Sequence, residues 1–107
     1  MRKISLALAA VSLPLLSLPA LAVEDGIAAQ CAADWPGDFA MQEFCAKQQA
    51  KGHEQFIAAT EALDSDSPLQ PAAEKCLDDW QNEHGQDWAM VNFCFEQQVK
   101  SFERLNQ

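Results

Sequence analysis

Residues 31–49 read CAADWPGDFAMQEFCAKQQ, and residues 76–98 read CLDDWQNEHGQDWAMVNFCFEQQ. The two stretches share, in the same order, Cys, Asp, Trp, Asp, Ala, Met, Phe, Cys and a pair of Gln. They differ in length only between the Trp and the second Asp, where the first has the two residues Pro36-Gly37 and the second has residues 81–86. Identities in this order indicate an internal duplication in which each copy is one structural unit.

Each repeat predicts a long helix that begins after its second aspartate. Asp38 and Asp87 each precede an aromatic residue and a long stretch of helix formers, so each suits a helix N-cap. We therefore expect helices over residues 39–63 and 88–106. A spacing of four places Met, Cys and one Gln of each repeat on one stripe of its helix.

A shorter helix is expected before each long one. In both preceding segments an apolar residue, the Cys and the Trp are spaced by four. Pro36-Gly37 would end the first short helix, whereas the second would start near Pro71 and end near Gly85. The predicted fold class is all-α, with two tandem disulfide-stapled helical hairpins and four helices after a cleaved signal peptide.

The amino terminus predicts export. Arg2 and Lys3 precede an apolar run over residues 4–18, and small residues at Ala20 and Ala22 fit a signal peptidase. The run is too short to span a membrane, and no later stretch reaches that length. We expect a signal peptide over residues 1–22, a first hairpin over 23–63, a linker over 64–70 and a second hairpin over 71–107. The mature protein would be periplasmic or secreted.

All four cysteines, Cys31, Cys45, Cys76 and Cys94, lie in this predicted mature chain. An even number in a short exported protein indicates disulfides. Within each hairpin the two cysteines differ in height by only ~3 Å, at about 1.5 Å per helical residue. Pairing Cys31 with Cys45 and Cys76 with Cys94 is therefore the simplest connectivity, each bond contributing about 3 kcal/mol. Pairing across the repeats stays open.

The composition argues against several classes of function. Removal of Arg2 and Lys3 leaves 5 basic and 16 acidic residues, a net charge of −11, which disfavours nucleic acid and anionic membranes as partners. The cysteines lack the close spacing of zinc knuckles, and His53 and His84 occupy non-equivalent positions, so no metal or other cofactor is expected. No nucleophile motif is present, and we expect no enzyme.

The repeated aromatic residues have two interpretations. They either close the core around each disulfide or form an interaction surface near the turns, and the duplication favours the core. One glutamine of each pair, on the Met–Cys stripe, is expected to bond the turn backbone or a neighbouring helix. The candidate aromatic residues are Trp35, Phe39, Trp80, Trp88 and Phe93.

The duplicated pattern resembles small exported bacterial proteins that share a Cys, Trp, Asp-aromatic-x-Met, Cys, Gln signature of a helical hairpin. The resemblance covers both repeats and implies no particular activity. We expect a protein-interaction or accessory module of the cell envelope, with another envelope protein as its partner. The alternative is a metal- or ligand-sequestering periplasmic protein, and an enzyme comes third.

Overall fold

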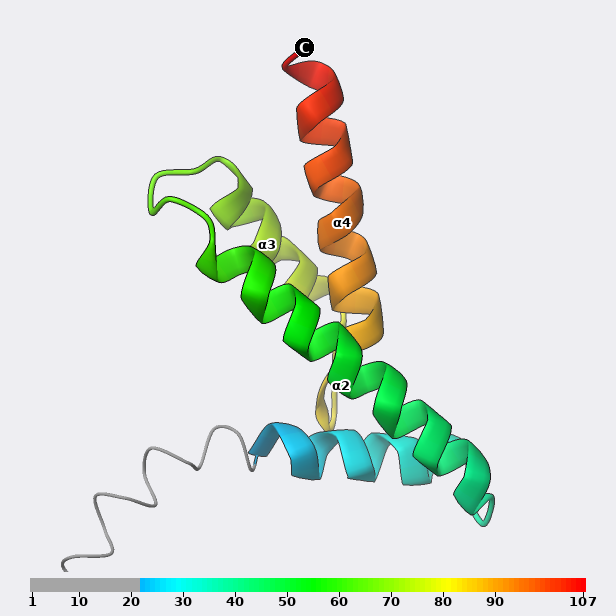
Figure 1. The fold of residues 1–107 in the computed structure, drawn as a ribbon. Coiled ribbons are helices and arrows are strands. Elements are labelled where there is room, and N and C mark those ends of the chain that lie inside the picture. Colours follow the sequence, from blue (N-terminus) through cyan, green and yellow to red (C-terminus); the bar gives the residue numbers. More distant parts are fainter. Residues whose placement is uncertain (1–21) are drawn as a thin grey trace, which may run out of the picture.

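The computed structural model describes residues 22–107, so the predicted signal peptide lies, except for Ala22, outside the described residues. The chain forms an amino-terminal helix over residues 22–34, α2 (Phe39–Glu61), α3 (Leu69–Asp79) and α4 (Trp88–Leu105), as Figure 1 shows. Two short strands, β1 (Gln81–Asn82) and β2 (Gly85–Gln86), precede α4. The all-α prediction with four helices is confirmed. None of the described helices is long and apolar enough to cross a membrane.

Both predicted aspartate caps are present. The Asp38 carboxylate accepts a hydrogen bond from the Met41 backbone N–H at 3.1 Å, and Asp87 accepts one from the Met90 N–H at 3.2 Å. Each satisfies one of the backbone donors that the first turn of a helix leaves free. These caps explain why α2 and α4 begin at the residues that the sequence predicts.

The segment between the second Trp and Asp87 corrects the sequence-based expectation. The second short helix, α3, ends at Asp79 rather than near Gly85, and residues 81–86 form an antiparallel hairpin with pairs Gln81–Gln86 and Asn82–Gly85. The Asn82 Oδ1 accepts the His84 N–H at 2.8 Å, and Gly85 has a φ of 125°. A local side-chain bond and a glycine in the left-handed region favour a tight turn over another turn of helix.

The linker begins and ends two residues earlier than predicted, because α2 ends at Glu61 and residues 62–68 follow it. Helix α3 begins at Leu69, whose N–H donates to the Ser67 hydroxyl at 3.1 Å. Pro71 lies in its first turn, as expected, because a proline there removes no intrahelical hydrogen bond.

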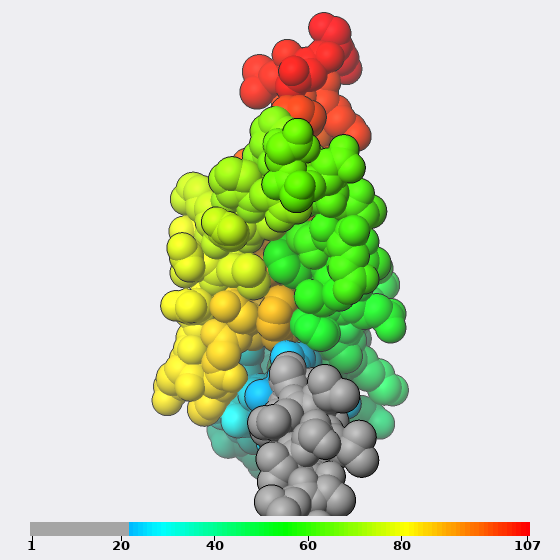
Figure 2. All heavy atoms as spheres, turned by 90° about the vertical axis from the view of Figure 1, so that its left-hand side faces the viewer, coloured from blue at the N-terminus to red at the C-terminus, as the bar shows by residue number. Residues whose placement is uncertain are grey.

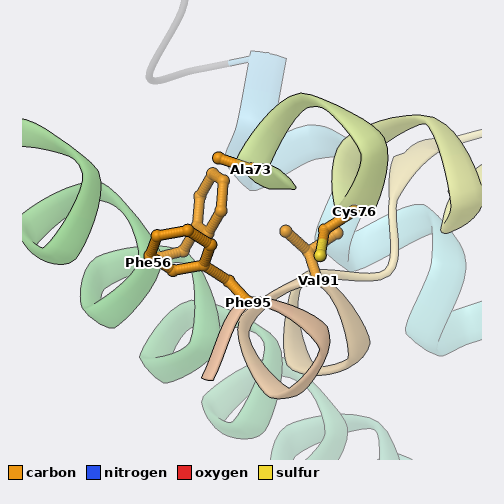
Figure 3. Close-up of a cluster of buried hydrophobic side chains, with 5 residues drawn as sticks. All are labelled: Phe56, Ala73, Cys76, Val91 and Phe95. Atoms are coloured by element: carbon orange, nitrogen blue, oxygen red, sulfur yellow. The ribbon is translucent and has the colours of Figure 1, made fainter. Parts of the chain in front are cut away.

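One hydrophobic core joins the two repeats. Phe56 of α2 joins a buried cluster with Ala73 and Cys76 of α3 and Val91 and Phe95 of α4, and it lies beside Ala73 and Phe95 (Figure 3). The rings of Phe56 and Phe95 meet edge to face, with centroids 5.6 Å apart. The long helix of the first hairpin therefore continues onto the second hairpin, and the repeats form one packed unit.

The β-hairpin holds the amino-terminal helix against this unit. The Asn82 side-chain amide donates to the Gln30 Oε1 at 3.0 Å, and Gln30 is buried. A Cβ on Gly26 would overlap the His84 carbonyl oxygen, so glycine permits the approach. Figure 1 shows the hairpin reaching down to this helix. The extra residues of the second repeat thus contact the first.

Candidate functional site

The predicted disulfide pairing is confirmed: Cys31 bonds Cys45, and Cys76 bonds Cys94. Each pair of Cα atoms is 5.7 Å apart, and each bond joins the two helices of one hairpin. No cysteine in residues 22–107 is free. The turn end of each hairpin is therefore held by a covalent bond about two helical turns away.

Gln49 forms the polar contact between the repeats. Its side-chain amide donates to the Asp87 Oδ1 at 2.9 Å, and its Oε1 accepts the Trp88 backbone N–H at 2.6 Å. Gln49 is buried, so both bonds are largely shielded from water. The prediction that the stripe glutamine bonds a neighbouring helix is confirmed for Gln49, which completes the cap of α4.

A glycine next to this contact lets α2 and α4 cross closely. A Cβ on Gly52 would lie 2.6 Å from the Trp88 carbonyl oxygen and 2.9 Å from the Ala89 Cα. One residue further, His53 meets the Trp88 ring edge to face, with centroids 4.5 Å apart. His53 is half-buried by this contact, rather than a fully solvated surface residue.

The core interpretation fails for most candidate aromatic residues. Only Trp88 packs at the core, with its ring 6.1 Å from that of Phe56. The others are exposed: Phe39 by 77%, Phe93 by 53%, Trp35 by 42% and Trp80 by 38%. Both tryptophans lie just beyond the end of a short helix, where no facing helix covers them.

Two further apolar side chains, Phe44 and Leu105, are also exposed, by 56% and 84%. Neither was among the candidates. The repeat alignment was the signal that would have found Phe44, because it is the counterpart of Phe93. We call Trp35, Phe39 and Phe44 the exposed turn end of the first hairpin.

The repeats align without a gap from their second aspartate, so each residue of α4 corresponds to the α2 residue 49 positions earlier. The register continues past the glutamine pairs, since Lys51 aligns with Lys100 and Glu54 with Glu103. Gln98 is therefore the counterpart of Gln49. Unlike Gln49, Gln98 is exposed, and its side-chain amide has no hydrogen-bond partner within residues 22–107.

Two shallow clefts flank α2. One, of ≈ 510 Å³, lies between the amino-terminal helix and α2, with Ile27, His53 and Ile57 in its wall. The other, of ≈ 570 Å³, lies between α2 and α4 and includes Phe95 and Val99. Across residues 22–107, no three His, Cys, Asp or Glu side chains are grouped so as to hold a metal ion.

Comparisons with protein-family models, with curated proteins and with solved structures gave no match. The candidate site thus rests on the chain's own geometry. Its distinctive features are the buried contact that Gln49 makes and two exposed apolar residues, Phe39 and Leu105, whose counterparts Trp88 and Phe56 pack at the core.

Proposed function

We propose that the protein is an exported protein-binding module of the bacterial cell envelope that docks through the exposed turn end of its first hairpin. The observation that carries the proposal is the exposure of Phe39, Phe44 and Trp35 by 77%, 56% and 42%. Aromatic side chains dominate the binding energy of many protein interfaces. Large apolar side chains exposed near one turn of a small monomer are candidates for a contact surface.

The rigidity of the hairpin supports this function. The Cys31–Cys45 bond fixes the two helices on either side of the turn, and the Asp38 cap fixes the start of α2. A docking surface that is ordered before binding loses less conformational entropy when its partner arrives. Trp35 and Phe39 are therefore presented on a scaffold that needs little rearrangement.

Two features support the proposed compartment. The signal peptide predicted over residues 1–22 directs the chain out of the cytoplasm. The two disulfides suit an oxidising compartment, such as the bacterial periplasm or the cell exterior. The expected partner is an envelope protein with an apolar surface that can cover these side chains.

Site-specific photocrosslinking in cells tests the proposal. A photoreactive phenylalanine analogue at position 39 or 44 should give discrete crosslinked products, because each position lies on the docking surface. The same analogue at Glu74, an exposed residue on α3, is the control and should give none. Equal labelling at all three positions, or none at 39 and 44, would reject the docking surface. A melting temperature that rises with added divalent metal would instead favour the sequestering alternative.

A further inference from the structure

The packing of α2 on the start of α4 joins the two repeats, and we call this contact the template. In the template, Gln49, Gly52 and Phe56 of α2 lie against Asp87 and Trp88, at the start of α4. One repeat supplies the late part of its long helix, and the other supplies its helix start. The duplication means that each molecule also carries an unused late helix and an unused helix start.

Both unused surfaces are exposed. The late part of α4 carries Gln98 and Leu105, and the counterpart of Leu105 is the core residue Phe56. This part of α4 extends past the rest of the molecule in Figures 1 and 2. The unused helix start carries Asp38 and Phe39, the counterparts of Asp87 and Trp88. Leu105 and Phe39 are exposed by 84% and 77%, the two highest values among the large apolar side chains of residues 22–107.

We propose that the partner at the first hairpin is a second copy of this chain, whose α4 docks there as α2 docks on the second hairpin. The inference rests on the proposed function and names the occupant of the part of that surface around Phe39. Gln98 of one molecule would bond Asp38 and the Phe39 N–H of the next. Leu105 would lie beside Ala28 of the amino-terminal helix and Ala46 of α2.

The residues that would surround Leu105 are exposed or half-buried. In the template, Phe56 contacts Ala73 of α3 and Phe95 of α4. Their counterparts are Ala28, aligned through the first cysteine of each repeat, and Ala46. Ala28 is exposed and Ala46 is half-buried, whereas the β-hairpin contacts the amino-terminal helix elsewhere, at Gly26 and Gln30.

One polar pair of the template is replaced by residues of opposite charge at the corresponding positions of the exposed surfaces. In the template, the Asn92 amide donates to Gln55 at 2.9 Å. The counterparts of these two residues are Glu43 and Arg104. A neutral pair within the molecule would thus be replaced by an ion pair between molecules, and opposite charges at the rim favour this register over others.

Two other changes make the intermolecular contact weaker than its template. Ser101 replaces Gly52, so the two helices cannot approach as closely, since Gly52 already meets the opposing backbone. The buried Val91 and Phe95 are replaced by Gln42 and Ala46, which bury less apolar surface. The association should therefore depend on protein concentration. Because the two surfaces differ, the contact is heterologous, and copies join head to tail.

Sedimentation of the purified mature chain with both disulfides intact tests the proposal. The wild type should associate as its concentration rises. Phe39→Ala and Leu105→Ala should each weaken association by about tenfold or more, as expected when a large apolar side chain leaves an interface. Phe93→Ala removes an aromatic residue that is also exposed, but lies outside the contact, and is the matched control. Ser101→Gly should strengthen association, because it restores the close crossing of the template.

Mixing the two weakened variants identifies the head-to-tail arrangement. Phe39→Ala keeps its α4 surface and Leu105→Ala keeps its helix start, so the mixture should form pairs that neither variant forms alone. Exchanging the charges as Glu43→Arg with Arg104→Glu should restore the association that either single change weakens. Circular dichroism of each variant checks that the fold is retained.

A wild type that stays monomeric at millimolar concentration would overturn the second-copy proposal. So would association that Phe39→Ala and Leu105→Ala leave unchanged. Neither result would reject the proposed function, which would survive if position 39 still crosslinks to a different protein in cells. Monomeric protein together with no crosslinked product would reject both.

Discussion

Replacing Gly52 by alanine has two opposite effects on the stability of the fold, and the structure shows which of them is larger. Alanine in a helix interior is favoured over glycine by about 1 kcal/mol, so helix propensity alone predicts a more stable protein. The new Cβ, however, would lie 2.6 Å from the Trp88 carbonyl oxygen, 2.8 Å from its carbon and 2.9 Å from the Ala89 Cα. These are backbone atoms of a capped helix start, and they cannot move aside as a flexible side chain can.

The cost of separating the helices exceeds the gain in propensity. Overpacking of this kind costs about 1–3 kcal/mol. The shift would also stretch the two hydrogen bonds of Gln49, one turn away, each of which contributes about 1 kcal/mol. We expect a net loss of about 2 kcal/mol, which in a domain of this size lowers the melting temperature by about 8–16 °C.

Thermal unfolding followed by circular dichroism at low protein concentration, with disulfides intact, measures this loss. Ser101→Ala is the matched control: it lies at the same repeat position on α4, where a Cβ is already present, and should raise stability slightly. A melting temperature for Gly52→Ala equal to or above that of the wild type would refute the close crossing of α2 and α4.

Three further predictions use the same protein. Gln49→Ala should destabilise the fold by about 2–3 kcal/mol, because it removes two shielded hydrogen bonds. Gln48→Ala, at the exposed neighbour, should change stability by less than about 0.5 kcal/mol. Equal melting temperatures of the two variants would contradict the role of Gln49. Phe56→Ala should cost about 3–5 kcal/mol and Trp35→Ala much less, as chemical denaturation would show, and a reversed order would place the core elsewhere. The intact mass of exported protein should correspond to a chain that begins at Val23 and carries two disulfides, and a retained Met1 would overturn the predicted export.

The sequence predicted best what is local to each repeat. The aspartate caps and the disulfide pairing depend on spacing within one hairpin, where helical geometry relates residue number to height. Residues 81–86 were misjudged because a length difference alone does not distinguish an extra helical turn from a β-hairpin. The bond from Asn82 to His84 and the φ of Gly85 decide between them.

The contact between the repeats was out of reach because it is not local. Nothing in the spacing of α2 indicates that Phe56 packs on the other hairpin, 17 residues before Ala73 along the chain. Trp35 and Trp80 share a helical stripe with a cysteine, which favoured the core, but each lies where its short helix has already ended. Helical periodicity indicates which side of a helix is apolar and not how far along it the partner extends.

The placement of the disulfides has a mechanical consequence. They bridge residues 14 and 18 positions apart within the hairpins, and neither crosses the contact between the repeats. A force applied to the two ends of the chain would be carried first by the noncovalent packing of α2 on α4. After that packing ruptures, the two disulfides would still prevent the loops that they close from extending. These loops correspond to about 45 Å and 60 Å of extended chain. The molecule would lengthen in one step under tension and then resist further extension. Its maximum end-to-end length would therefore depend on whether the cysteines are oxidised.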